Sequence, residues 1–244
     1  MSNRNGLVFY KGVKDAIPIA IGYISVSFAF GISAVEQGLP LWSPILISLS
    51  NFTGTGQFVG VNMIASGAVL FEIAFTVLII NLRYMLMSLS LSQKLSPDVK
   101  FWQRLVIAFG NTDEIFAVSI QQKDELNFRY MIGLILTSYL GWNAGTALGA
   151  LASSILPLSV RSALGIAIFA MFIAIIVPPA KSARPVLRVV VISIIMSCIF
   201  RFVPGLNAIG SGWVFIICGV VSAGVGAYLN PVAQVKDGED GDGL

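Results

Sequence analysis

The sequence contains no histidine, only two cysteines and few charged residues. Of its 244 residues, 11% are charged and 56% are hydrophobic. Since a soluble domain carries roughly a quarter of its residues as charged types, this chain lacks the polar surface that a water-facing fold needs. The absence of histidine excludes zinc sites that use histidine, Ser-His dyads and most imidazole proton relays.

Other scarce features restrict the function further. The cysteines, Cys198 and Cys218, lie in apolar runs and imply no disulfide framework. The formal net charge of +3 is spread over loops and indicates no nucleic-acid partner. No Walker A motif occurs, so any energy source is an ion gradient or a separate subunit. We therefore expect no enzymatic activity, no cofactor and no metal site.

The hydrophobic residues form long runs with few or no charges. A membrane helix needs about 20 mainly apolar residues, because lipid offers its backbone no hydrogen-bond partners. The first run is too long for a typical signal peptide and has no clear cleavage site, so we predict that it is retained. The fold class is predicted to be all-α: a polytopic integral membrane protein with about six full spans, at residues 16–35, 67–82, 131–156, 163–177, 186–199 and 213–229.

The basic residues restrict how these spans are oriented. Lys and Arg favour the cytoplasmic side, and each full span changes sides. All three basic clusters lie inside only if residues 44–65 and 105–121 enter the membrane and return to the same side. Glycines and polar residues favour a break in each segment, within 51–57 and 110–114. Both termini are then cytoplasmic. The clusters are Arg4/Lys11/Lys14, Lys94/Lys100/Arg104 and Lys181/Arg184/Arg188.

The order of these elements predicts two repeat-like halves. Residues 44–92 combine a broken element with an outside-to-inside span, and residues 104–152 combine one with an inside-to-outside span. Inverted repeats with discontinuous helices are characteristic of secondary transporters, whose sites lie near the bilayer midplane. We predict one transmembrane domain over 1–235, followed by a disordered cytoplasmic tail over 236–244.

The first break offers polar groups that could bind a solute. The positive end of a half-helix beginning near Gly56 suits an anionic group, such as an amino-acid carboxylate. Close packing of helices at the glycines is the alternative interpretation. The candidate residues are Asn51, Thr53, Gly54, Thr55, Gly56 and Gln57.

Asp113 and Glu114 are the only adjacent carboxylates within a predicted membrane element. A charge there costs roughly 2.5–3.5 kcal/mol on insertion scales, so such a residue usually faces a cavity or a partner. We predict that one of them carries a proton or binds a substrate ammonium group. A structural role is compatible with this, with Asn111 capping a helix whose first turn holds both acids.

Two of the spans carry further candidates. Arg83 needs an acceptor, either Asp113 or Glu114, unless its side chain reaches the cytoplasmic interface. A polar and glycine-rich stretch near residue 143 forms either a pocket wall or a helix-packing seam. Its members are Gly141, Trp142, Asn143, Gly145 and Thr146.

Four motifs occur in a fixed order: SNFTGTGQF at 50–58, NLRYMLMS at 81–88, FGNTDEIFA at 109–117 and WNAGTALG at 142–149. In order and spacing they resemble the AzlC family, over nearly the whole chain. Tyr84 stands where a histidine often follows the arginine in relatives, so no imidazole can carry a proton there.

The resemblance implies the large subunit of a branched-chain amino acid exporter in the bacterial inner membrane. It implies a small AzlD-type membrane partner, export driven by the proton motive force, and valine, leucine and isoleucine as substrates, with methionine as a further candidate. The alternatives are a transporter or channel for another small solute, and a non-transporting scaffold subunit. The motif residues that carry over are Gly54, Gly56, Gln57, Asn81, Arg83, Thr112, Asp113, Glu114 and Thr146.

Overall fold

The computed structural model describes residues 8–153, 155, 157, 173, 176, 177, 180–206 and 209–229. Within these residues the chain forms helices and one isolated backbone bridge, and no strand, which confirms the all-α prediction for this part of the chain. The helices are α1 (Phe9–Glu36), α2 (Trp42–Ser50), α3 (Thr55–Ala65), α4 (Leu70–Lys94), α5 (Phe101–Phe109), α6 (Asp113–Ile120), α7 (Phe128–Ala152), α9 (Arg184–Phe202) and α10 (Ser211–Leu229).

The helices agree with most of the predicted spans. Within the described residues, α1, α4, α9 and α10 are long and apolar enough to cross a membrane. Helix α7, with 25 residues, covers most of the span predicted at 131–156. The span predicted at 163–177 lies almost entirely outside the described residues, and the tail at 236–244 lies wholly outside them. The total of six spans therefore stays a prediction.

The chain divides into two compact units. Residues 1–172 form the first, which holds α1 to α7, and residues 173–244 form the second, which holds α9 and α10. In the second unit α9 and α10 pack together as a hairpin, with Gly226 close to Val189. The prediction of a single transmembrane domain over 1–235 stays a prediction.

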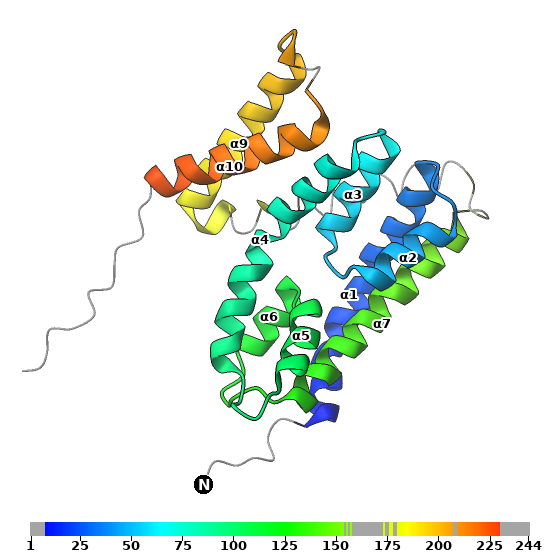
Figure 1. Ribbon diagram of the computed structural model, residues 1–244, viewed down its shortest axis with the longest axis vertical. Helices are drawn as coiled ribbons and strands as arrows, with labels where there is room; N and C mark the ends of the chain where they lie inside the picture. The colour runs from blue at the N-terminus through cyan, green and yellow to red at the C-terminus, as the bar shows by residue number, and fades with distance from the viewer. Residues whose placement is uncertain are drawn as a thin grey trace, which may run out of the picture. The chain divides into compact units, whose positions relative to one another are not determined.

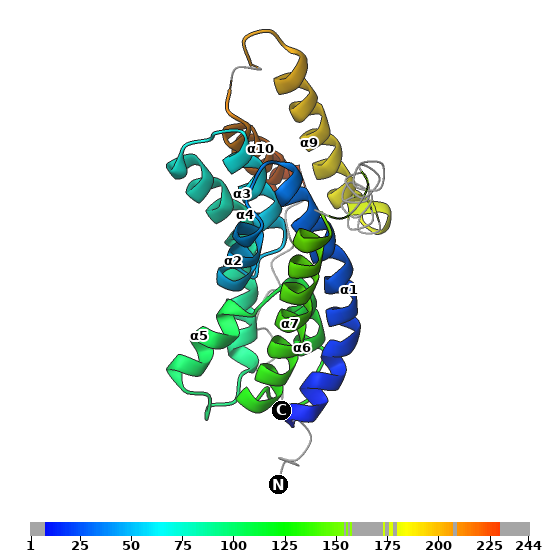
Figure 2. The same ribbon diagram turned by 90° about the vertical axis from the view of Figure 1, so that its right-hand side faces the viewer.

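Helices α1 and α7 form the centre of the first unit. They lie side by side in both views (Figures 1 and 2). They run in parallel, because Gly12 faces Tyr130 near their starts and Gly31 faces Thr146 near their ends. A β-carbon on Gly31 would lie 2.3 Å from the Thr146 carbonyl oxygen, so the backbones touch directly. Such close approach through small residues is the usual packing of helices in membranes.

The first predicted break is present, and the chain turns back at it. Helix α2 ends at Ser50, and α3 begins at Thr55. Just after α2, Phe52 packs on Tyr23 in the middle of α1, with ring centres 5.7 Å apart. On the return, Phe58 packs on Phe30 nearer the end of α1, at 5.1 Å. Because α2 itself starts shortly after α1 ends, α2 and α3 enter and leave from that same end.

The second predicted break is also present, between α5 and α6. Near its start α5 lies against the beginning of α7, where Trp102 contacts Phe128 at 5.3 Å between ring centres. At its end Phe109 reaches Tyr139, almost halfway along α7, at 6.0 Å. Helix α5 therefore enters from the end at which α7 begins.

Helix α6 then returns to that end. Ser119 donates a hydrogen bond to the Met131 sulfur at 3.5 Å, close to the start of α7. Lys94, the last residue of α4, donates to the carbonyl oxygens of Ile120, the last residue of α6, and of Gln122 just beyond it. A cation at the exposed carbonyls of a helix end is favourable. The two hairpins thus enter the first unit from opposite ends.

The order of elements in the two hairpins is the same. A helix of 9 residues, a break, a helix of 11 residues and a helix of 25 residues make up α2, α3 and α4. Helices α5, α6 and α7 follow with 9, 8 and 25 residues. Because α4 ends where α7 begins, the second set runs opposite to the first. This arrangement is consistent with the predicted inverted repeat. The repeat stays a prediction, because the two halves have only slight sequence similarity.

Candidate functional site

The two breaks meet at the middle of α1 and α7. The Tyr139 ring of α7 contacts Phe52 beside the first break at 5.4 Å and Phe109 beside the second at 6.0 Å. The Tyr23 ring of α1 also contacts Phe52, and its hydroxyl lies 2.7 Å from the Thr112 hydroxyl in the second break. The two breaks, 60 residues apart in sequence, therefore meet. The residues at this meeting point, which include Tyr23, Phe52, Phe109, Thr112 and Tyr139, form the centre of the first unit.

Gly54 makes the sharp turn of the first break. Its φ of 53° and ψ of −90° lie where a side chain causes strain, so glycine is required. The six-membered ring of Trp142 lies against it, 3.4 Å from the place that a β-carbon would occupy. The predicted break region of 51–57 thus narrows to 51–54, and Thr55, Gly56 and Gln57 belong to the first turn of α3.

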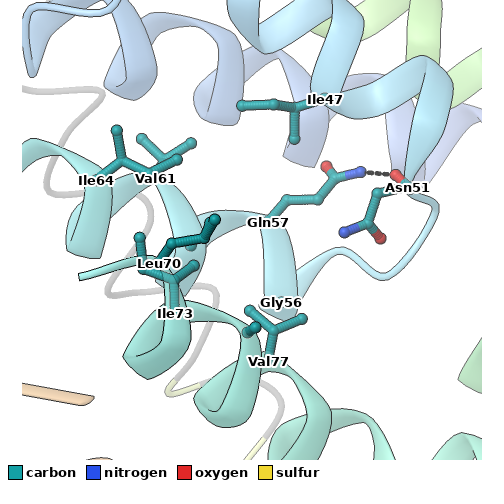
Figure 3. Close-up of a pocket in the computed structure, with 11 residues that line it drawn as sticks. Ile47, Asn51, Gly56, Gln57, Val61, Ile64, Leu70, Ile73 and Val77 are labelled. Atoms are coloured by element: carbon teal, nitrogen blue, oxygen red, sulfur yellow. Dashed lines mark hydrogen bonds between the residues drawn. The ribbon is translucent and has the colours of Figure 1, made fainter. Parts of the chain in front are cut away.

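The Gln57 side chain forms hydrogen bonds across the first break. It is 2% exposed, and its amide nitrogen donates to the Asn51 carbonyl across the break (Figure 3). Its amide oxygen accepts from the Trp142 indole nitrogen at 3.0 Å. Ser48 joins the same group and lies 2.9 Å from the Thr146 hydroxyl. Trp142 and Thr146 therefore anchor α2 and α3 to α7, and both ends of the Gln57 amide are engaged.

Fewer backbone amides are free at the break than the sequence predicts. The Gly56 amide donates to the Thr53 carbonyl at 3.4 Å, and the Gln57 amide donates to the Gly54 carbonyl at 2.9 Å. Within the described residues the amides of Gly54 and Thr55 have no acceptor. This is usual at the start of a helix. An anionic group at α3 would meet these two amides.

Two oxygen atoms beside Gly56 lack donors. The Thr53 hydroxyl oxygen and the Asn81 side-chain oxygen are both buried, and neither has a hydrogen-bond partner within the described residues. A β-carbon on Gly56 would lie 2.6 Å from the Thr53 oxygen and 3.4 Å from the Asn81 oxygen. The glycine therefore brings α3 close to α4 at the point where these two acceptors lie.

Arg83 connects the two breaks. Its guanidinium lies 2.9 Å from the Asp113 carboxylate, so of the alternatives that the sequence left open, Arg83 pairs with Asp113. It also donates to the Tyr84 hydroxyl at 3.1 Å, and that hydroxyl donates to the Thr53 carbonyl at 3.2 Å. Both charged side chains remain close to half exposed. The ion pair thus lies at an open edge of the centre.

Thr112 caps α6, which corrects the expectation that Asn111 does so. The Thr112 hydroxyl accepts from the Ile115 amide at 3.4 Å. Asp113 and Glu114 occupy the first turn, as predicted, where negative charge is favourable. The Glu114 carboxylate accepts a hydrogen bond from the Tyr23 hydroxyl. Each acid therefore already has a partner within the protein.

The two remaining asparagine candidates bond to other parts of the first unit. Asn111 is 3% exposed and donates to the Ser88 hydroxyl at 3.0 Å, which ties the second break to α4. Asn143 donates to the Tyr139 carbonyl in its own helix at 2.9 Å. The side-chain oxygen of each has no donor within the described residues.

An apolar cavity of about 250 Å³ lies between α2, α3 and α4 (Figure 3). Its walls are aliphatic except at one end, where Asn51 and Gln57 lie. Gly56 also lines the cavity, and the unpartnered oxygens of Thr53 and Asn81 lie beside this glycine. The lining residues are Ile47, Asn51, Gly56, Gln57, Gly60, Val61, Ile64, Leu70, Ile73, Ala74 and Val77.

No group of three or more metal-ligating acidic or cysteine side chains occurs within the described residues. The polar groups of the centre are neutral apart from Arg83, Asp113 and Glu114. This arrangement is suited to binding a small solute with both polar and aliphatic parts.

Several residues of the centre were not predicted from the sequence. Tyr23, Ser48, Ser88 and Tyr139 all make contacts between elements there. The available signal was a hydroxyl side chain inside an apolar run. That signal is weak, because most such hydroxyls bond to their own helix backbone, as Ser27 does with the Tyr23 carbonyl.

The fold and the site define a helical membrane protein built around two discontinuous helices. Residues 18–156 match the family described as AzlC protein, which covers more than half of the chain. The chain belongs to the AzlC family, as the four motifs predicted. No solved structure matches it.

Three relatives illustrate the similarity. An uncharacterised membrane protein of Archaeoglobus fulgidus is 38% identical over 176 residues, which are 71% of this chain and 77% of that protein. Inner membrane protein YgaZ of Escherichia coli is 35% identical over 67% of this chain and 70% of its own length. Branched-chain amino acid transport protein AzlC of Bacillus subtilis is 27% identical over 60% of this chain and 58% of its own length. This chain is thus a membrane protein of a transport family.

Proposed function

We propose that this protein exports branched-chain amino acids from the bacterial cytoplasm, together with a small AzlD-like membrane subunit and driven by the proton motive force. Valine, leucine and isoleucine are the proposed substrates, with methionine as a further one. The protein lies in the inner membrane with both termini in the cytoplasm. The name of the Bacillus subtilis relative supports the substrate class.

One observation carries the proposal: two broken helices, entering from opposite ends, meet at a polar centre that borders an apolar cavity. Discontinuous helices near the midplane expose backbone amides and carbonyls to a solute. Here the free amides of Gly54 and Thr55 suit a carboxylate. The cavity of about 250 Å³ next to them suits an aliphatic side chain.

The charged residues are proposed to couple transport to protons. Asp113 and Glu114 lie in the first turn of α6, and both bond to helices of the other half or of the central pair. A proton on Asp113 would weaken its ion pair with Arg83 and so loosen α6 from α4. This would allow one hairpin to move relative to the other as the site changes sides.

The first experiment measures export from vesicles containing this chain, with and without a small AzlD-like partner, loaded with labelled valine. We expect efflux that rises with an imposed pH gradient and loses this increase on addition of a protonophore. In the variant Asp113→Asn/Glu114→Gln, we expect efflux to fall to the level of empty vesicles while the protein stays in the membrane.

Two outcomes favour the rival functions. Efflux that is unaffected by the protonophore, and follows only the valine gradient, would identify a passive channel. A protein that moves no amino acid with any partner, and tolerates changes throughout 51–57, would be a scaffold subunit. Normal export by the double variant would remove the two acids from the mechanism.

A further inference from the structure

We infer that the substrate's ammonium group binds between the Thr53 hydroxyl and the Asn81 carboxamide, and not at Asp113 or Glu114. This inference rests on the proposed function. It assigns the positive end of an amino acid to a neutral site beside Gly56, a residue that also lines the apolar cavity.

The first argument is that these two oxygens lack donors. Leaving a buried acceptor without a donor is costly, so proteins seldom keep one without a reason. The Thr53 hydroxyl oxygen and the Asn81 side-chain oxygen are two such atoms from different helices. An ammonium group carries three donors and no acceptor, which matches a pair of oxygens.

The second argument is that Gly56 holds the two acceptors beside the cavity. A β-carbon there would lie 2.6 Å from the Thr53 oxygen and 3.1 Å from the Asn81 side-chain nitrogen, so no larger residue leaves both groups in place. Gly56 also lines the apolar cavity. An amino acid whose α-carbon lies at this glycine can place its side chain in the cavity and its ammonium group at the oxygens.

The third argument concerns the carboxylate of the same substrate. The unused amides of Gly54 and Thr55 immediately follow Thr53 in the chain. The ammonium and carboxylate groups of an amino acid are both attached to one carbon, so their binding groups must be neighbours. Thr53, Gly54 and Thr55 supply acceptor and donors within three consecutive residues.

The fourth argument is that the two acids are engaged elsewhere. Asp113 is bonded to Arg83 at 2.9 Å, and a substrate ammonium would have to displace a guanidinium. Glu114 accepts from the Tyr23 hydroxyl. Neither carboxylate lines the cavity. The acids remain available for a proton, and the neutral oxygens bind the ammonium group.

The test compares leucine with 4-methylpentanoate, which has the same carbon chain and carboxylate but no ammonium group. The full chain is used with its small partner in the vesicle assay. In Thr53→Val and Asn81→Leu we expect the KM for leucine to rise at least about tenfold. Inhibition of leucine export by 4-methylpentanoate is expected to change less than about twofold, because that competitor never used these oxygens.

Two control variants separate a lost hydrogen bond from a damaged fold. Thr53→Ser keeps the hydroxyl, so its KM for leucine is expected to rise much less than that of Thr53→Val. Gly22→Ala adds a methyl group on α1 where no atom lies within 4 Å, and is expected to export normally. Gly56→Ala fills the space between the two acceptors, and its KM is expected to rise as in Thr53→Val.

Three results overturn the inference. The first is an unchanged KM for leucine in both Thr53→Val and Asn81→Leu. The second is a parallel loss of leucine and 4-methylpentanoate binding, which would mean that these residues only hold the break in shape. The third is leucine export that requires sodium and loses this requirement in Thr53→Val, which would mean that the site binds a free cation. If the unmodified protein exports no leucine, the proposed function fails first and this inference with it.

Discussion

Several polar side chains in the first unit bond to residues far away in the sequence. Tyr23 reaches Glu114, 91 residues later, and Ser48 reaches Thr146, 98 residues later. In hydrocarbon an unpartnered polar group is costly, so each of these bonds limits where its helix can lie. The two broken hairpins are therefore held by specific polar contacts as well as by apolar packing.

The ion pair between Arg83 and Asp113 gives a prediction at the scale of single residues. Since both side chains are close to half exposed, at 45% and 43%, solvent screening weakens the pair. We expect Arg83→Gln to lower the melting temperature in detergent by only about 2 °C. Adding Asp113→Asn is expected to lower it no further, because the partner has already been lost.

Thermal unfolding of the two single variants and the double variant checks this expectation. If the two single effects simply add in the double variant, the two residues do not interact in the folded protein. The double variant also separates stability from transport. We expect it to unfold like Arg83→Gln and to have lost proton-coupled export.

At the scale of helices, the first unit depends on the contact between α1 and α7. The glycines of α7 recur every fourth residue, at Gly141, Gly145 and Gly149, and all three face α1. The stretch around Trp142 is therefore a helix-packing seam, and its role as a pocket wall stays a prediction. Its glycines pack on α1, whereas Trp142 and Thr146 bond towards α2 and α3.

Adding one methyl group to this seam is expected to destabilise the protein. In Gly149→Ala the new carbon would lie 2.0 Å from the Phe28 carbonyl oxygen, so α1 and α7 must separate. We expect a loss of about 1–3 kcal/mol, the usual result of overpacking. Gly22→Ala, the same change at an open position of α1, is expected to gain about 0.5–1 kcal/mol from helix propensity alone.

Thermal or denaturant unfolding of the two variants in detergent measures both effects. The opposite signs make the comparison decisive, because the chemical change is identical. Equal stability of Gly149→Ala and the unmodified protein would mean that the backbones of α1 and α7 do not touch at Gly149.

At the scale of the whole molecule, the hairpins decide which loops share a side of the membrane. If α2 and α3 form a re-entrant hairpin, the loops before α2 and after α3 lie on the same side. If residues 44–65 instead crossed the membrane, these loops would lie on opposite sides. The basic loop after α4 lies at the other end of the first unit, beside the start of α7.

Single cysteines test this topology in whole cells, after replacement of Cys198 and Cys218 by alanine. Glu36→Cys and Ser66→Cys introduce exposed thiols before α2 and after α3. We expect both to react with a membrane-impermeant maleimide. Asp98→Cys, in the basic loop, is expected to react only after the membrane is permeabilised. Reaction of Glu36→Cys alone would show that the segment between the loops crosses the membrane.

Much of the architecture could be predicted because it follows from local properties of the chain. The apolar runs and the glycine-rich interruptions gave the helices α1, α4, α9 and α10 and both breaks. The exact limits of the breaks could not be predicted. Whether Thr55 is helical depends on the turn at Gly54, and that turn is held by Trp142 from α7. The capping of α6 by Thr112 likewise depends on the backbone conformation there.

By itself the sequence determined that this chain is a helical membrane protein and where its helices are interrupted. Hydropathy, basic residues and glycines act through the transfer and conformational energies of their own segments. The tertiary structure alone decided that the breaks meet and that Arg83 pairs with Asp113. It also decided that the Gln57 amide bonds within the protein, whereas the side-chain oxygens of Thr53 and Asn81 have no donor within the described residues. These outcomes depend on contacts between distant segments, which only the packing of α1, α4 and α7 brings together.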